Sequence, residues 1–188
     1  MTVVSSKVVV RGSTVVDGVV EDVLAHIFNF KSRRERLARL YEEGVEFTAL
    51  RISPHTCVLR DLRDVSKFMK SLGFVGLQLR EFVCRHTWKK EGSNMFISAM
   101  GDIGRAEFPV QHGKYVRASI RGYWKLERLP PILGKISRTR MTYFCCSDLK
   151  GIIPSNATGR RDTQLILEEL ERARVRVSKS RRTLWRVQ

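Results

Sequence analysis

The side chains that most often bind metals or act as acids and bases are scattered along this chain. Its four histidines fall in separate predicted elements and share no HxxxH or HExxH spacing: His26, His55, His86 and His112. Its four cysteines form no CxxC pair: Cys57, Cys84, Cys145 and Cys146. The last two are adjacent, so in a strand they point to opposite faces. The pattern predicts no metal site and no cofactor, and it favours free, mostly buried thiols.

Motifs for nucleophilic or phosphate chemistry are equally weak. Ser147-Asp148-Leu149-Lys150 matches SxxK, but that motif needs a helix to bring lysine beside serine, and here it ends a predicted strand. The sequence has no P-loop, GxGxxG or GxSxG. The carboxylate pairs Glu42-Glu43 and Glu168-Glu169 are most simply surface charges. We therefore predict a protein that is not an enzyme.

Charge is the strongest compositional feature. The 188 residues include 35 lysines and arginines against 19 aspartates and glutamates, which gives a formal net charge of +16. Such a surplus predicts an anionic partner, either phospholipid headgroups or nucleic acid phosphates, and does not choose between them. With 43% hydrophobic residues and no apolar run of roughly 18, the chain predicts a folded domain without a membrane-spanning helix.

The N-terminus alternates like a strand and lacks the apolar block of a secretory signal. We expect a cytoplasmic protein that is peripheral on membranes. A mitochondrial location stays open, because the first carboxylate comes only at Asp17. We divide the chain into a domain at 1–178 and a basic tail at 179–188.

Alternation and helical spacing predict many strands between two helices. We expect strands in seven segments: 3–16, 45–52, 56–62, 81–89, 95–100, 115–126 and 138–147. Asp17 is the expected N-cap of a first helix that ends near Asn29, and residues 66–72 form a short one. Pro130-Pro131 interrupts the strands, and segment 33–43 is a solvated charged face or a helical turn. A long C-terminal helix begins at about Arg161.

The distribution of apolar side chains predicts how these elements pack. One face of segment 81–89 carries four side chains: Phe82, Cys84, His86 and Trp88. In segment 115–126, alternate residues including Trp124 face an apolar interior. The C-terminal helix carries an apolar stripe: Ile166, Leu170, Ala173 and Val177. This predicts an α+β fold in which the helix covers one face of an antiparallel sheet.

Three segments in the second half of the chain resemble the START (StAR-related lipid transfer) family. They are Gly113-Lys114-Tyr115-Val116-Arg117-Ala118, Thr142-Tyr143 followed by Asp148-Leu149-Lys150-Gly151-Ile152-Ile153-Pro154, and Arg80-Glu81-Phe82-Val83. The resemblance covers residues 80–175 and is thin before them, where Arg36-Leu37 stands in place of the family's tryptophan–aspartate pair. It implies the helix-grip fold of the Bet v 1-like superfamily, a curved antiparallel sheet wrapped around a long C-terminal helix, with an apolar cavity for one lipid.

The resemblance implies a ligand cavity built from eight residues: Asp61, Phe82, Cys84, His86, Trp88, Trp124, Ile166 and Leu170. In sterol-binding relatives an acid and an arginine pair inside the cavity. Asp61 falls near the position of the acid, but His86 stands where the arginine would be, which weakens the sterol interpretation. The alternatives are a hydrogen-bonded core histidine at His86 and an exposed strand carboxylate at Asp61.

The resemblance also implies a gate formed by loop 102–112 and the C-terminal helix. Its candidate side chains are Ile103, Phe108 and Val110, which either dip into a membrane or tuck into the base of the loop. Basic residues expected to bind an anionic surface are Arg160, Arg161, Arg172, Arg174, Arg176, Lys179, Arg181, Arg182 and Arg186, with Trp185 as an interfacial anchor. The alternative for the tail is a disordered, solubilising segment.

Two functions follow from these patterns. The first is non-enzymatic lipid binding and transfer, with a phospholipid or sterol in the cavity and an anionic membrane surface as docking partner. The alternative is a START-like fold used as a structural or RNA-binding component of a ribonucleoprotein assembly, with the cavity filled by its own side chains. The space enclosed beneath the C-terminal helix bears directly on this choice.

Overall fold

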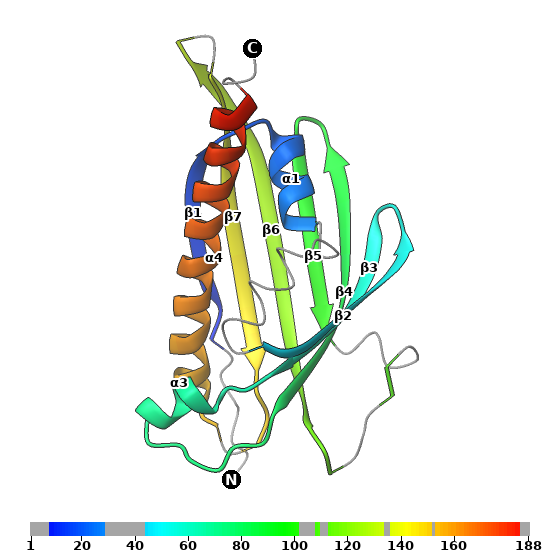
Figure 1. Cartoon of the computed structure of the whole chain (residues 1–188), viewed down its shortest axis with the longest axis vertical. Coiled ribbons are helices and arrows are strands. Elements are labelled where there is room, and N and C mark those ends of the chain that lie inside the picture. The colour runs from blue at the N-terminus through cyan, green and yellow to red at the C-terminus, as the bar shows by residue number, and fades with distance from the viewer. Residues whose placement is uncertain are drawn as a thin grey trace.

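Seven strands of the described chain form one curved sheet, and helix α4 lies along its inner face (Figure 1). The computed structural model describes residues 8–28, 44–101, 108–109, 113–133, 136–151 and 153–184. The strands are β1 (Val10–Asp17), β2 (Gly44–Ser53), β3 (Thr56–Arg63), β4 (Arg80–Glu91), β5 (Asn94–Gly101), β6 (Val116–Ile132) and β7 (Ile136–Asp148). The helices are α1 (Val20–Phe28), α3 (Ser66–Ser71) and α4 (Ser155–Leu184). This is the α+β helix-grip fold that the sequence predicts.

The sheet order is β1-β7-β6-β5-β4-β3-β2, so the first strand lies beside the last one. Each strand pairs antiparallel with its neighbour in this order. Beyond the end of β5, the two strands that β5 otherwise separates also pair with each other. There the sheet bends, and β4 pairs directly and parallel with β6 over residues 80–82 and 116–118. Gly101 permits this bend, because a Cβ atom at that residue would lie 2.6 Å from the carbonyl oxygen of Ile120.

Helix α4 packs on β1 and β7 through the apolar stripe that the sequence predicts. All four residues of the stripe are buried: Ile166, Leu170, Ala173 and Val177. Gly12 of β1 lets the helix lie close, because a Cβ atom there would stand 2.5 Å from Ile166 Cγ2 and 2.7 Å from Leu170 Cδ1. A side chain at this position would push α4 away from the sheet.

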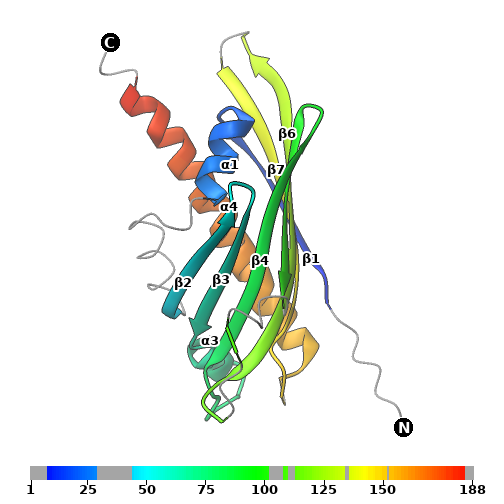
Figure 2. The same cartoon turned by 90° about the vertical axis from the view of Figure 1, so that its right-hand side faces the viewer.

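The two shorter helices close the ends of the space beneath α4. Helix α1 and helix α4 lie on the same side of the sheet (Figure 2), and α1 buries Val20, Val23 and Leu24 there. At the other end, Val65 and Met69 of the α3 segment pack against the start of α4 in a second apolar cluster. No helix in the described ranges combines the length and the apolar content that a bilayer crossing requires.

Two helix starts differ from their predictions. Helix α4 begins at Ser155, directly after Pro154, so Arg161 lies inside the helix rather than at its start. Asp17 is the last residue of β1 rather than a helix cap, and α1 begins at Val20. Strand β1 begins at Val10, while residues 3–7 and segment 33–43 lie outside the described ranges.

The two adjacent prolines do not end β6, which continues through Pro130-Pro131 to Ile132. They interrupt only its pairing with β7, which shifts register between Leu129 and Ile132. The reason is that proline has no N–H group to donate to the neighbouring strand.

Candidate ligand cavity

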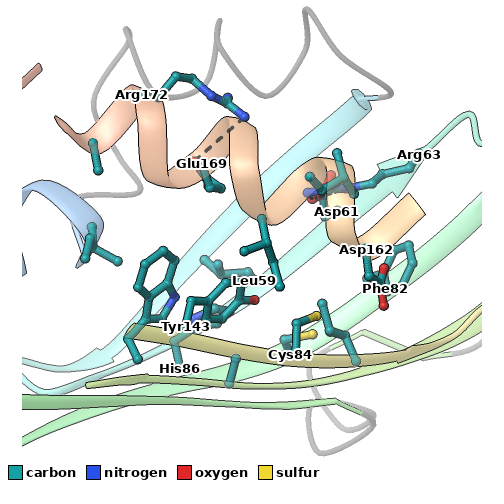
Figure 3. Close-up of a pocket in the computed structure, with 18 of the residues that line it drawn as sticks. Leu59, Asp61, Arg63, Phe82, Cys84, His86, Tyr143, Asp162, Glu169 and Arg172 are labelled. Carbon is teal, nitrogen blue, oxygen red and sulfur yellow. Dashed lines mark hydrogen bonds and ion pairs between the residues drawn. The ribbon is translucent and has the colours of Figure 1, made fainter. Parts of the chain in front are cut away.

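A cavity of about 140 Å³ lies between the inner face of the sheet and α4 (Figure 3). Its wall includes side chains from α1, from the five strands β3 to β7 and from α4. Tyr143, His86 and Cys84 reach toward the helix from the sheet, while Asp162 and Glu169 belong to the helix above them. The three layers of residues therefore enclose a space that their own side chains do not fill completely.

Most of the predicted cavity residues line this space: Asp61, Phe82, Cys84, His86, Trp124 and Ile166. The structure places Trp88 and Leu170 elsewhere. The Trp88 ring packs on His55, with centroids 4.2 Å apart, and its Nε1 donates to the Pro54 carbonyl at the β2–β3 turn. Leu170 is buried where α4 rests directly on Gly12 of β1. The far end of β4 thus extends past the cavity, whereas Leu170 lies beside the cavity and faces β1.

Two stacked aromatic rings form part of the apolar wall. Trp124 of β6 and Tyr143 of β7 are cross-strand neighbours, with ring centroids 4.0 Å apart and planes 10° apart. Burial raises the pKa of Tyr143 well above its ordinary value, and burial likewise raises the pKa of the Cys145 thiol to about 12. Both groups therefore stay protonated near neutral pH, and Cys145 is a poor nucleophile.

Charged side chains meet at one end of the cavity in balanced pairs. On β3, Arg63 Nη2 lies 2.6 Å from Asp61 Oδ2. On α4, Arg161 Nη1 lies 3.2 Å from Asp162 Oδ1. The guanidinium carbons of Arg63 and Arg161 lie 6.0 and 5.8 Å from the centre of the Phe82 ring. Pairing each buried charge with an opposite one offsets the cost of removing it from water.

Asp61 and Arg63 form an acid–arginine pair inside the cavity, in which the acid is the one expected and the arginine is not. Asp61 is 7% exposed, so the structure does not support the alternative of an exposed strand carboxylate. The position where an arginine was expected holds His86, which lines the cavity. The signal for Arg63 was present in the sequence, because residues two apart in a strand share one face.

Asp162 connects the beginning of α4 to the end of β7. Its Oδ1 accepts a hydrogen bond from Ser147 Oγ at 2.7 Å, and its Oδ2 accepts one from the Ser147 backbone N–H at 3.0 Å. Burial raises the pKa of Asp162, although these bonds and the charge of Arg161 act in the opposite direction. Sequence reasoning missed this residue. Its position could have been predicted, because Asp162 lies one helical turn before Ile166 and therefore on the same side of the helix as the apolar stripe.

Two residues predicted for an anion-binding surface face the cavity instead. Arg161 is only 2% exposed, since it lies beside the Phe82 ring of β4 and pairs with Asp162. Arg172 also lines the cavity, and its Nη2 lies 3.8 Å from Glu169 Oε2 (dashed line in Figure 3). Arg161 and Arg172 therefore line the cavity instead of belonging to the predicted basic surface.

The remaining described members of that set are exposed. Arg160 is exposed near the start of α4, whereas Arg174 is held by Glu171 through bonds of 2.7 and 2.8 Å. The other predicted members lie outside the side chains that the structure describes: Arg176, Lys179, Arg181, Arg182, Trp185 and Arg186. A basic surface on the last turns of α4 stays a prediction.

Phe108, a predicted gate residue, is held on the opposite face of the sheet from the cavity. Its carbonyl accepts a hydrogen bond from Arg117 Nη2 at 2.9 Å, and Arg117 Nε donates to Glu81 Oε2 at 2.9 Å. Glu81 and Arg117 alternate with Phe82 and Ala118, which face inward. The Phe108 carbonyl is therefore fixed beside Arg117, and the role of Phe108 in a gate stays a prediction. Ile103 and Val110 lie outside the described ranges.

The groups that could do chemistry are engaged with separate partners. Ser147 of the SxxK motif bonds to Asp162, whereas Lys150 Nζ lies 2.7 Å from Asp148 Oδ2. His26 and His86 line the cavity from α1 and β4. Among the described residues, no three or more His, Cys, Asp or Glu side chains are grouped so that they could hold a metal ion.

Comparison with known proteins shows where this architecture occurs. No protein-family model matches the sequence, and no curated protein matches it. The lipid transfer and protein localization domain of human StarD13 (DLC2) is similar in structure, with 19% identity, a TM-score of 0.61, and coverage of 88% of this chain and 75% of that one. A STAR-related lipid transfer protein from Xanthomonas axonopodis is also similar, with 16% identity, a TM-score of 0.66, and coverage of 89% of this chain and 84% of that one.

Human STARD10 also matches, with 16% identity, a TM-score of 0.62 and coverage of 92% of this chain, which spans 62% of the STARD10 chain. The di-domain aromatase/cyclase BexL gives a TM-score of 0.50 at 12% identity, and this chain spans 49% of it. At these identities the likeness shows a shared fold, which occurs both in lipid transfer domains and in an aromatase/cyclase.

Proposed function

We propose that this START-like domain binds one lipid between the inner face of its sheet and α4, and carries it without changing it chemically. The observation that carries the proposal is the cavity beneath α4, whose wall combines apolar side chains with paired charges. Moving apolar surface of a ligand from water into such a site is favourable by about 25 cal/mol per Å². The proteins of the same fold that are named for lipid transfer support this choice of ligand class.

The size of the cavity determines how such a ligand would be held. An apolar cavity of roughly 150 Å³ accepts benzene, whereas drug-sized ligands occupy pockets of about 300–1,000 Å³. At about 140 Å³, this cavity accommodates only part of a lipid in the conformation described. Binding a whole acyl chain or ring system therefore requires the cavity to open.

The arrangement of the helices gives a route for that opening. Helix α4 packs on β1 and β7 at one edge of the sheet, whereas Leu59, Asp61 and Arg63 of β3 face it across the cavity from the other side. Moving α4 and β3 apart would enlarge the space without breaking the β1–β7 pairing. The balanced charges at the cavity end favour a lipid whose buried part is uncharged, because a net charge there would lack a partner.

The chemistry of the cavity favours a carrier over an enzyme. The Cys145 thiol stays protonated, since burial raises its pKa to about 12. The Asp162 carboxylate accepts two hydrogen bonds from Ser147 and pairs with Arg161, so it connects α4 to β7. Asp162 thus holds the helix in position, and neither Asp162 nor Cys145 is left to act as a nucleophile or a general base.

The test is native mass spectrometry of the purified protein for bound lipid, followed by transfer of a fluorescent lipid between vesicles. Ala99→Leu adds bulk to the cavity wall from the inner face of β5 and should reduce binding. Its control is Ser98→Leu, the same new side chain one residue earlier, on the outer face. A wild-type protein that is always empty and transfers no lipid would contradict the proposal, as would equal binding by Ala99→Leu and Ser98→Leu.

A second variant guards against simple misfolding of Ala99→Leu. Ile166→Ala enlarges the cavity from the side of α4, whereas Leu167→Ala removes a side chain that is 61% exposed on the same helix. We expect Ile166→Ala to change which chain lengths bind and Leu167→Ala to leave them unchanged. Identical ligand profiles for the two variants would place the lipid elsewhere.

A further inference from the structure

The face of the sheet opposite α4 carries a line of aromatic side chains, here named the outer aromatic row: Phe96 of β5, Tyr123 of β6 and Phe144 of β7. They alternate along their strands with inward residues such as Ile97 and Trp124. The Tyr123 ring lies 5.7 Å from the Phe96 ring and 6.3 Å from the Phe144 ring, between centroids. Phe96 is 9% exposed and Tyr123 is 37% exposed, so the row presents aromatic surface at its centre.

Basic side chains surround the row. The Arg11 guanidinium carbon lies 5.5 Å from the centre of the Phe144 ring. Lys89 Nζ lies 5.9 Å from the centre of the Phe96 ring. Arg121 and Lys125 stand two residues before and after the central tyrosine, and therefore on the same face. Five neighbouring strands thus contribute to one aromatic and cationic surface.

Two of these cations are not neutralised by an acid. Lys125 lies 2.8 Å from Glu127, and Lys89 is paired with Glu91. By contrast, no ion pair between described residues includes Arg11 or Arg121. Both arginines are exposed, and the residues opposite them in the neighbouring strands are not acids. This face therefore carries two arginines, one on the edge strand β1 and one on β6, whose charges no acid among the described residues balances.

No described helix covers the outer aromatic row. Helices α1 and α4 both pack on the inner face, as Figure 2 shows. Tyr123, at the centre of the row, is consequently part of the surface of the domain. A partner that binds them must supply flat apolar groups together with negative charge.

We propose that the outer aromatic row binds single-stranded nucleic acid, with bases on the Tyr123 and Phe144 rings and phosphates at Arg11 and Arg121. Bases stack on exposed aromatic side chains of a sheet, while nearby cations bind the backbone. The net charge of +16 favours any polyanion at long range. The binding is independent of the lipid cavity, because the two sites use opposite faces of the sheet.

The geometry favours single strands over duplexes and membranes. Bases in a duplex are already stacked on each other and cannot lie on a protein ring. A bilayer would need apolar surface to insert, and the row offers little of it, because Phe96 is 9% exposed and Tyr123 is 37% exposed. A single base can still stack on one exposed ring, so the row suits splayed bases between hydrated phosphates.

The first test measures fluorescence anisotropy of labelled oligouridine RNA and oligothymidine DNA with the full chain. Tyr123→Ala should weaken binding by about tenfold, the effect expected for loss of one stacked base. Tyr123→Phe should bind within about twofold of wild type, because it keeps the ring. Tyr123→Leu keeps apolar bulk without a ring and should behave like Tyr123→Ala. The ratio of RNA to DNA affinity shows which polymer the face prefers.

The second test separates a specific site from diffuse attraction. Arg121→Gln and Arg174→Gln remove the same charge, one beside the row and one on the exposed side of α4. Arg121→Gln should reduce affinity several-fold and lower the slope of log affinity against log salt by about 0.7, the value for one phosphate contact on a single strand. Arg174→Gln should change the affinity by less than about twofold.

Three results would overturn the proposal. The first is no binding of either oligonucleotide at low salt. The second is equal effects of Arg121→Gln and Arg174→Gln, or of Tyr123→Leu and Tyr123→Phe, since either equality means attraction without stacking. The third is wild-type binding to oligonucleotides by Tyr123→Ala together with loss of binding to phosphatidylserine vesicles, which would assign the face to membranes.

Discussion

The inner and outer faces of the sheet are built from alternate residues of the same strands, and the charges beside the cavity differ from Arg121 on the outer face in how they are paired. Beside the cavity, Asp61 is paired with Arg63 and Asp162 with Arg161. On the outer face, Arg121 is exposed and joins no ion pair among the described residues. Burial explains the difference, because a lone charge beneath α4 would lose its hydration, whereas an outer arginine keeps it. The inner face therefore suits an uncharged ligand, and the outer face suits an anion.

Adjacent residues on β6 show how sharply the two environments are separated. Trp124 points inward and is 7% exposed, whereas Tyr123 points outward and is 37% exposed. Each belongs to an aromatic group, since Trp124 stacks on Tyr143 and Tyr123 lies between Phe96 and Phe144. A shift of one residue in the register would exchange the two sets and destroy both surfaces.

The largest expected contrast between the faces is in stability. Leu126→Ala on the inner face removes a fully buried side chain that lies opposite Met95 and Met141 in the neighbouring strands. It should lower the free energy of unfolding by about 2–5 kcal/mol, because the lost burial is compounded by the cavity that remains. Urea denaturation followed by circular dichroism measures the loss.

The matched control is Lys125→Ala, one residue away on the outer face. It removes a surface ion pair with Glu127 and should cost no more than about 1 kcal/mol. Similar losses from Leu126→Ala and Lys125→Ala would mean that the outer face is also buried, and the comparison between the faces would fail.

Local patterns in the sequence were sufficient for the elements and for the inner face. The alternation in 81–89 placed Phe82, Cys84 and His86 on one face, and the structure lines the cavity with all three. The stripe from Ile166 to Val177 likewise predicted which side of α4 is buried. Both patterns depend on the fixed periods of strands and helices, which the sequence displays directly.

Features that depend on contacts between distant segments could not be predicted in the same way. The bend at Gly101 follows from its approach to Ile120, and nothing local marks that pair. The true start of α4 lies six residues before the predicted one, and Arg161 lies beside Phe82 of β4, a contact that nothing local in the sequence marks. Phe108 was predicted as a gate residue, and nothing local in the sequence marks the bond between its carbonyl and Arg117. Curvature and loop direction come from tertiary packing.

A second contrast concerns the pH dependence of stability. Because burial raises the pKa of Asp162, the folded protein holds this proton more tightly than the unfolded chain does. Stability should therefore fall as pH rises from the ordinary carboxyl pKa toward the raised one. Asp162→Asn removes this titration, so the slope of the free energy of unfolding against pH should become less negative there. Urea titrations at a series of mildly acidic pH values measure the slope.

The control for this prediction is an exposed carboxylate with the opposite shift. Glu171 bonds to Arg174 on the surface of α4, and this bond lowers the pKa of Glu171. Its contribution to stability is lost as pH falls, so Glu171→Gln should shift the slope in the other direction. The shift should be small, because solvent screens an exposed pair. A change of the same sign in Asp162→Asn and Glu171→Gln would contradict the assignment of Asp162 as a buried acid.

The smallest expected contrast needs no substitution, because adjacent cysteines on β7 report on the two faces. Cys145 is 4% exposed beneath α4 and its pKa is raised to about 12, whereas Cys146 is half-buried on the outer face opposite Arg121. Iodoacetamide at neutral pH should therefore modify Cys146 at least about tenfold faster than Cys145, since only an accessible thiolate reacts. Peptide mapping after timed labelling separates the two sites, and labelling in urea should make their rates converge. Equal rates in the folded protein would mean that water and small reagents pass freely beneath α4, so that the space is an open channel rather than a closed apolar cavity.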